Sequence, residues 1–151
     1  MSKIFLENEQ ATIKLGSQLA ESIKSCSAKN IEIHLHGDLG AGKTFISRSI
    51  IRSSGWSGLV KSPTYTLCEE YDLNEILFLH IDLYRSEDIE DVDLFDIDRS
   101  IDKKKVVIIE WPEKLKTKRN PEIEIFLEHK SNKREDSVKI HSQELLETIN
   151  L

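Results

Sequence analysis

Apolar residues follow two different spacings along the first third of the chain, and these spacings predict the first elements. Residues 31–36 alternate between apolar and polar types, which predicts a strand, and residues 45–52 are apolar at helical spacing. Upstream, residues 3–6 predict a short strand, followed by a helix that Asn8 or Thr12 caps. Strands and helices therefore alternate, as in an α/β protein.

The second half of the chain is richer in predicted strands. Residues 66–71 and 76–81 predict an antiparallel hairpin, with residues 72–75 between them. Four consecutive β-branched residues at 106–109 predict a strand buried on both faces, as in a parallel sheet. The other predictions are a brief strand at residues 59–60, two closing strands at 121–127 and 137–140 joined by a charged loop at 131–136, and a terminal helix over 142–151.

A glycine-rich stretch separates the alternating run from the helical run that follows it. Gly37-Asp38-Leu39-Gly40-Ala41-Gly42-Lys43-Thr44 fills the phosphate-loop pattern G-x-x-x-x-G-K-[ST] without a mismatch. The glycines let backbone N–H groups converge on phosphates, and the helix that follows adds the positive end of its dipole. We expect Lys43 to reach the β/γ-phosphates and the Thr44 hydroxyl to ligate Mg²⁺. A glycine-rich turn that binds nothing is the alternative.

Two acidic residues end predicted strands. Asp82 follows the second hairpin strand, and Glu110 follows the run of β-branched residues. Phosphate-loop proteins place a carboxylate for Mg²⁺ or water at such positions, so both are candidates. Trp111 comes next, and its indole ring either packs in the hydrophobic core or forms an exposed contact. The stretch Ser62-Pro63-Thr64-Tyr65 predicts an exposed connection that senses a γ-phosphate, or an ordinary turn.

Length and composition bound the kind of protein. With 151 residues, of which 38% are hydrophobic, we expect one domain spanning residues 1–151. The sequence contains no run of 18 apolar residues and no signal peptide at its start, which predicts a soluble cytoplasmic protein without a membrane association. The two cysteines, Cys26 and Cys68, lie far apart and predict reduced thiols.

The charge distribution constrains possible partners. A formal net charge of −6 argues against a protein that binds a nucleic-acid backbone by itself. A local basic stretch remains, and it is either a binding patch or a solvated loop; its members are Lys114, Lys116, Lys118 and Arg119. Residues 86–98 predict an acidic helix, which is either solvated or a docking surface for a basic partner.

Four stretches together resemble one family. Residues 37–44, 62–65, 80–85 and 110–113 stand in the order, and near the spacing, of the TsaE family of small ATPases in bacterial tRNA threonylcarbamoyladenosine synthesis. The resemblance covers almost the whole chain, although Phe45 replaces a small hydroxyl residue that often follows the Lys-Thr pair. It implies a phosphate-loop NTPase-like three-layer α/β sandwich, with a mixed, mostly parallel central sheet that includes an antiparallel hairpin.

The resemblance also implies a site that binds ATP and Mg²⁺. Asp82 and Lys43 would be the catalytic residues, with Asp82 ordering or activating the attacking water, and Thr44 and Glu110 would serve the metal. Residues 62–65 would be a first switch and residues 80–85 a second. The implied nucleotide contacts are Asp38, Leu39, Gly40, Ala41, Gly42, Lys43, Thr44, Thr64 and Trp111.

By the same resemblance, the protein would hydrolyse ATP while bound to the heterodimer of TsaD and TsaB. It would support threonylcarbamoyl transfer to adenosine 37 of tRNAs that read codons beginning with A, and it would meet the tRNA indirectly through the complex. We expect a monomer when it is isolated. Two other functions stay open: a small-molecule kinase, against which the scattered arginines argue, and a nucleotide-dependent binding switch with negligible turnover.

Overall fold

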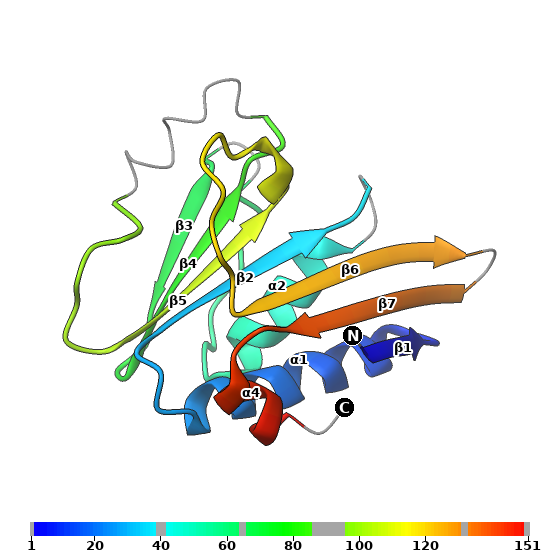
Figure 1. The fold of residues 1–151 in the computed structure, drawn as a ribbon, viewed down its shortest axis with the longest axis horizontal. Helices are drawn as coiled ribbons and strands as arrows, with labels where there is room; N and C mark the ends of the chain where they lie inside the picture. Colours follow the sequence, from blue (N-terminus) through cyan, green and yellow to red (C-terminus); the bar gives the residue numbers. More distant parts are fainter. Residues whose placement is uncertain (1, 39–41, 64–65, 86–95, 131–132, 150–151) are drawn as a thin grey trace.

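The computed structural model describes residues 2–38, 42–63, 66–85, 96–130 and 133–149, which form one seven-stranded sheet with helices packed on it (Figure 1). The helices are α1 (Glu9–Ser25), α2 (Lys43–Ser53) and α4 (Gln143–Thr148), with one 3₁₀ turn, η1 (Pro112–Lys114). The strands are β1 (Ser2–Leu6), β2 (Asn30–His36), β3 (Cys68–Asp72), β4 (Ile76–Asp82), β5 (Lys104–Glu110), β6 (Ile123–Lys130) and β7 (Lys133–Ile140).

The sheet is parallel at its centre and antiparallel at both sides. Its strand order is β1-β7-β6-β2-β5-β4-β3. β2 pairs in parallel with β5 and β6, and β4 pairs in parallel with β5. β3 and β4 form the antiparallel hairpin, while β6–β7 and β7–β1 pair antiparallel on the other side. The predicted mixed sheet with its hairpin is therefore confirmed, and β5, the β-branched strand, lies between two parallel neighbours.

Apolar packing covers one face of the sheet and, at β4 and β5, part of the opposite face as well. Side chains of α1 and α2 share one buried cluster with one face of β2, β4, β5 and β6, which includes Leu19, Ile33, Ile50, Ile108 and Ile125. A second buried cluster lies on the opposite face of β4 and β5, where the chain around Ile97 covers it; it includes Leu79, Ile81, Val107 and Ile109. The alternation of side chains along each strand separates the two clusters.

Two predicted elements are wrong. Residues 59–60 form no strand, because Leu59 is 68% exposed and the adjacent Lys61 amide donates to the Tyr71 hydroxyl at 2.8 Å instead of to a strand. The charged loop predicted over residues 131–136 is shorter, because β7 begins at Lys133 and pairs with β6 on one side and β1 on the other. The predicted acidic helix at 86–98 lies outside the described residues up to position 95.

Two smaller expectations concern the cysteines and the membrane. Cys26 and Cys68 are both free thiols, as predicted, and burial raises the pKa of Cys68 to about 12. Among the helices of the described ranges, none combines the length and the apolar character that crossing a bilayer requires.

Candidate functional site

The glycine-rich stretch connects β2 to α2. Gly42 caps α2 with φ 99° and ψ 19°, a left-handed conformation that favours glycine over any residue with a Cβ atom. Lys43 and Thr44 then form the first turn of the helix. Leu39, Gly40 and Ala41 lie outside the described residues, as does Thr64, so the structure locates only part of the predicted nucleotide contacts.

The Lys43 side chain folds back over the loop. Its Nζ atom donates to the carbonyl oxygens of Gly37 at 2.5 Å and Asp38 at 3.0 Å, and it lies 3.9 Å from the centroid of the Trp111 ring. Burial lowers the pKa of Lys43, while the nearby carboxylates, Glu110 first among them, act in the opposite direction. The ammonium group is thus held over an indole ring, a favourable cation–π arrangement.

The two predicted carboxylates lie side by side. β4 and β5 are parallel neighbours, and their register places Asp82 directly opposite Glu110. Thr44 Oγ1 donates to Glu110 Oε1 at 3.4 Å, while the Tyr84 amide donates to Asp82 Oδ1 at 2.9 Å. Burial raises the pKa of Asp82, and the hydrogen bond from Tyr84 offsets only part of that effect. The carboxyl ends of the parallel strands therefore bring these groups to the start of α2.

His80, which the resemblance placed in the second switch without a role of its own, contacts Glu110. His80 is fully buried, and its Nε2 atom forms a hydrogen bond with Glu110 Oε2. In the part of the chain that the structure describes, its Nδ1 atom has no hydrogen-bond partner. Strand alternation was enough to place His80 on the face of Asp82, but the contact with Glu110 depends on the register between β4 and β5, which the sequence does not reveal.

The sequence position of Trp111 allowed two interpretations, a core residue and an exposed contact, and the structure shows features of both. Its ring is half-buried against the second apolar cluster and lies 5.0 Å from the Tyr84 ring, while its other contact is the Lys43 ammonium group. Its backbone has φ 60° and ψ 51°, a left-handed conformation that is rare for a bulky residue. The surrounding structure must hold this costly conformation, and such positions cluster at functional sites.

The oxygen atoms at this end of the sheet suit a hard cation. A hydroxyl from Thr44 and carboxylates from Glu110 and Asp82 are oxygen donors of the kind that Mg²⁺ prefers. Within the described ranges, no group of three or more His, Cys, Asp or Glu side chains is arranged to hold a metal ion. The few oxygen donors of Thr44, Glu110 and Asp82 would suit an ion that takes its remaining ligands from phosphate and water, as Mg²⁺ usually does.

The fold and this arrangement define a mixed α/β protein in which Lys43, two strand-end carboxylates and an aromatic ring lie together at the carboxyl ends of the parallel strands. The family model described as "Threonylcarbamoyl adenosine biosynthesis protein TsaE" matches residues 6–138. The chain belongs to the TsaE family.

Individual relatives agree with the family assignment. The chain is 39% identical to a tRNA threonylcarbamoyladenosine biosynthesis protein TsaE of Haemophilus influenzae, over 73% of this chain and 70% of the relative. It is 36% identical to a protein of the same description from Rickettsia felis, over 93% and 81% of the two chains. The crystal structure of Bacillus subtilis YdiB has the same fold, with a TM-score of 0.70, 21% identity and coverage of 97% and 90%.

Proposed function

We propose that this protein binds ATP with Mg²⁺ and hydrolyses it in the formation of threonylcarbamoyladenosine on tRNA, acting on the complex of TsaD and TsaB. The observation that supports the proposal most is the convergence of Lys43, Thr44, Asp82 and Glu110 at one end of the parallel strands. Family membership, and the descriptions of the relatives, support the role in tRNA modification.

The roles of the residues follow from their positions. Backbone N–H groups of the loop and of the first turn of α2 would bind the phosphate oxygens. Lys43 would exchange the carbonyls of Gly37 and Asp38 for the β/γ-phosphates, because a phosphate oxygen is a stronger partner for an ammonium group than a neutral carbonyl. Trp111 would limit where the Lys43 ammonium group moves. Such catalysis consists of positioning and charge stabilisation.

Glu110 and Asp82 would have different roles, one at the metal ion and the other at the attacking water. Thr44 and Glu110 would hold Mg²⁺, which when bound neutralises charge on the β- and γ-phosphate oxygens. Among the described residues, the Asp82 carboxylate beside Glu110 has one hydrogen-bond partner, the Tyr84 amide on Oδ1, so its other oxygen would be left to orient a water molecule. His80 would keep Glu110 turned toward Thr44.

ATP turnover by the protein alone and with the TsaD–TsaB heterodimer tests the proposal. We expect slow hydrolysis alone and strong stimulation by the heterodimer. Rapid hydrolysis that ignores the heterodimer would contradict the partner-dependent role. Efficient phosphoryl transfer to a nucleoside or nucleotide would favour the kinase instead, and turnover that stays negligible in the full assembly would favour the binding switch.

Variants assign the roles one residue at a time. Lys43→Ala should weaken binding of a fluorescent ATP analogue, and Thr44→Ala should raise the Mg²⁺ concentration needed for turnover. Asp82→Ala should keep nucleotide affinity but lower kcat by about 10²–10⁴-fold, the usual effect of losing a group that moves or orients a proton donor. Lys14→Ala, an exposed position on α1, is the matched control. Unchanged affinity in Lys43→Ala would refute the phosphate-loop assignment.

A further inference from the structure

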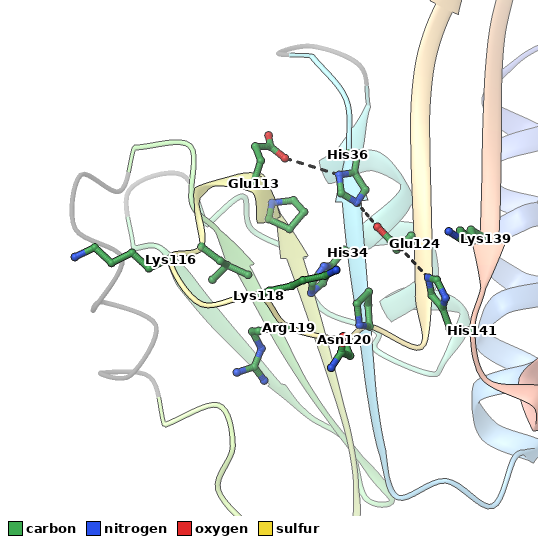
Figure 2. Close-up of a pocket in the computed structure, with 13 residues that line it drawn as sticks. His34, His36, Glu113, Lys116, Lys118, Arg119, Asn120, Glu124, Lys139 and His141 are labelled. Atoms are coloured by element: carbon green, nitrogen blue, oxygen red, sulfur yellow. Dashed lines mark hydrogen bonds and ion pairs between the residues drawn. The ribbon is translucent and has the colours of Figure 1, made fainter.

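A second concave region lies on the sheet face that α1 and α2 leave open. It is a groove of about 510 Å³ beside the end of β2 (Figure 2). His34 and His36 of β2 and Glu124 of β6 form its floor, because they alternate with the residues that face α1 and α2. The chain over residues 112–121 forms one wall, and the end of β7 with His141 forms the other. Histidines and carboxylates therefore meet beside the strand that leads into the glycine-rich stretch.

His36 is the last residue of β2, and the glycine-rich stretch follows it directly at Gly37. Its imidazole ring lies flat on the Phe126 ring, with 4.4 Å between the ring centroids and 9° between the ring planes. Its Nε2 atom forms a hydrogen bond with Glu124 Oε2 at 2.8 Å, and its Nδ1 atom lies 3.8 Å from Glu113 Oε2. The residue at the entry to the glycine-rich stretch is therefore held by contacts with β6 and η1.

Glu124 joins two histidines. Its Oε1 atom lies 2.8 Å from His141 Nε2, and its Oε2 atom is the one that His36 contacts. Figure 2 shows both contacts as dashed lines, in series with the contact between His36 and Glu113. Burial acts to raise the pKa of Glu124, but the hydrogen bonds with His141 and His36 lower it on balance. An ionised carboxylate can only accept, so the Nε2 atom of each histidine carries a hydrogen and donates it to Glu124.

The second nitrogen of His36 faces another acceptor. A neutral imidazole carries one N–H, and because Nε2 uses it on Glu124, Nδ1 has only a lone pair to offer the Glu113 carboxylate. Two acceptors repel each other, which agrees with a separation of 3.8 Å, longer than a hydrogen bond. The imidazolium ion, in contrast, donates from both nitrogens. Protonation of His36 would therefore draw the half-exposed Glu113 side chain into a hydrogen bond.

Glu113 also affects Lys43 in the glycine-rich stretch. Burial lowers the pKa of Lys43, while the negative charge of Glu113, second to that of Glu110, acts in the opposite direction. Under the proposed function the Lys43 ammonium group binds the β/γ-phosphates, so an unpaired carboxylate nearby repels the triphosphate. A Glu113 side chain that pairs with the His36 imidazolium would have its charge neutralised. Nucleotide binding would then meet less repulsion.

The other charged groups around His36 do not share this arrangement. His34 lies in the same strand, with 6.4 Å between the two ring centroids, and its Nε2 atom contacts Glu32. His141 contacts Glu124 through Nε2. The basic side chains that line the groove keep their charge between about pH 5 and pH 8; they are Lys116, Lys118, Lys139 and Arg119. Within the described ranges, His36 is thus the histidine of the groove with a carboxylate at each ring nitrogen.

We infer that His36 is a positioning residue of the phosphate loop, which in its protonated form holds Glu113 away from the nucleotide phosphates. The inference rests on the ATP-binding part of the proposed function, and not on hydrolysis or on TsaD–TsaB. Histidines change charge between about pH 5 and pH 8, so the affinity for ATP should rise as the pH falls through this range. The expected rise is about two- to fivefold, the range that a partly exposed ion pair corresponds to.

The test measures the affinity of the full-length protein for a fluorescent ATP analogue with Mg²⁺ between pH 8 and pH 6. His36→Gln keeps a donor for Glu124 but cannot take a positive charge, and Glu113→Gln removes the repelling carboxylate. His141→Gln is the matched control, because it removes the other histidine that contacts Glu124. The nucleotide itself titrates equally in all samples, so a difference in pH dependence between variants reports the protein.

Relative to His36→Gln, the wild type and His141→Gln should gain about two- to fivefold in affinity between pH 8 and pH 6. Glu113→Gln should bind the analogue more tightly than the wild type at pH 8 and equally well at pH 6. A His36→Gln variant that keeps the wild-type pH dependence would overturn the inference, and so would a His141→Gln variant that loses it.

A measurement without nucleotide separates this inference from the proposed function. In a double-mutant cycle of His36→Gln and Glu113→Gln, the shifts of the urea midpoint should add at pH 8 and depart from additivity at pH 6, because only the imidazolium pairs with Glu113. Coupling at pH 6 in a protein that binds no nucleotide counts against the phosphate-loop assignment alone. Additive shifts at pH 6 overturn the inference, whatever the affinity for the nucleotide is.

Discussion

His80 is the residue whose role depends most on its surroundings. It is an imidazole without solvent exposure that contacts Glu110, and Glu110 in turn accepts a hydrogen bond from Thr44 at 3.4 Å. A buried carboxylate that lost this partner would rotate toward another one, because an unpaired charge is costly in the interior. His80 is therefore a positioning residue for Glu110, the group that we propose binds the metal.

We predict that His80→Ala lowers the apparent affinity for Mg²⁺ in ATP turnover by about 10–100-fold, the usual cost of losing a partner that orients a metal ligand. Affinity for the nucleotide without metal should change little. His80→Gln, which retains a donor at a similar distance, should recover part of the Mg²⁺ affinity. A purely structural role predicts a different pattern, in which both variants lose thermal stability and neither shifts the Mg²⁺ titration.

Several residues of the site were predictable from short motifs, and others were not. Lys43 and Thr44 follow from the glycine pattern, and Asp82 and Glu110 from their positions at strand ends. These predictions needed only local sequence. The contact of His80 with Glu110 joins residues 30 positions apart and depends on strand register. The groove beside the end of β2 is a stronger case, because its three lysines come from two separate segments and only two of them, Lys116 and Lys118, lie in the basic stretch.

At the scale of elements, the contact between α1 and α2 depends on one missing side chain. Gly16 lies in the middle of α1 and faces Ser49 of α2. A Cβ atom at position 16 would lie 2.5 Å from Ser49 Cβ and 3.0 Å from the Ser49 carbonyl carbon. The helices are thus closer together than any residue other than glycine allows at this position.

Gly16→Ala should destabilise the protein by about 1–3 kcal/mol, the usual cost of overpacking. This loss opposes the gain of about 1 kcal/mol in helix propensity that the same change brings at an open site. Urea denaturation measures the difference in the free energy of unfolding. Ser17→Ala, at the exposed neighbour on the same helix, should be neutral or slightly stabilising. A Gly16→Ala variant as stable as wild type would show that α1 and α2 can separate without cost.

Periodicity predicted most elements, and its failures have physical causes. Asn8 caps α1 by accepting from the Ala11 amide at 3.0 Å, one of the two caps that the sequence suggested. The strand predicted at residues 59–60 failed because two apolar residues in a row carry no information about a partner strand. Residues 133–136 are charged but lie in β7, because pairing with strands on both sides satisfies their backbone groups.

At the scale of the whole molecule, a charged network joins three distant segments on the open face of the sheet. Arg119 donates to Glu32 of β2 at 2.7 Å and to Asp98 at 2.7 Å, while His34 contacts Glu32 at 2.7 Å. Burial alone would raise the pKa of Glu32, but its hydrogen bonds with His34 and Arg119 lower that pKa on balance. The hydrogen bond with Arg119 lowers the pKa of Asp98.

The sign of the pH dependence follows from these lowered pKa values. Because the native state binds protons at Glu32 and Asp98 less readily than the unfolded state, the network contributes its full stability above the ordinary carboxyl pKa of about 4. As the pH falls through the lowered native pKa values, both groups become protonated and the contribution disappears. Acidification should therefore reduce the stability of the wild type more than that of a protein without Arg119.

Arg119→Gln should lower the free energy of unfolding at pH 7 by about 1–3 kcal/mol, because it leaves the buried Glu32 carboxylate with only one side-chain partner. Urea denaturation at pH 7 and at steps from pH 5 to pH 3 should show the gap from wild type closing as the carboxyl groups protonate. Lys118→Gln removes a neighbouring exposed charge and should produce no such gap at any pH. A gap for Arg119→Gln that stays constant through pH 3 would mean that Arg119 stabilises the fold through packing of its apolar stem, and that segments 96–100 and 115–121 are not joined to β2 by charge.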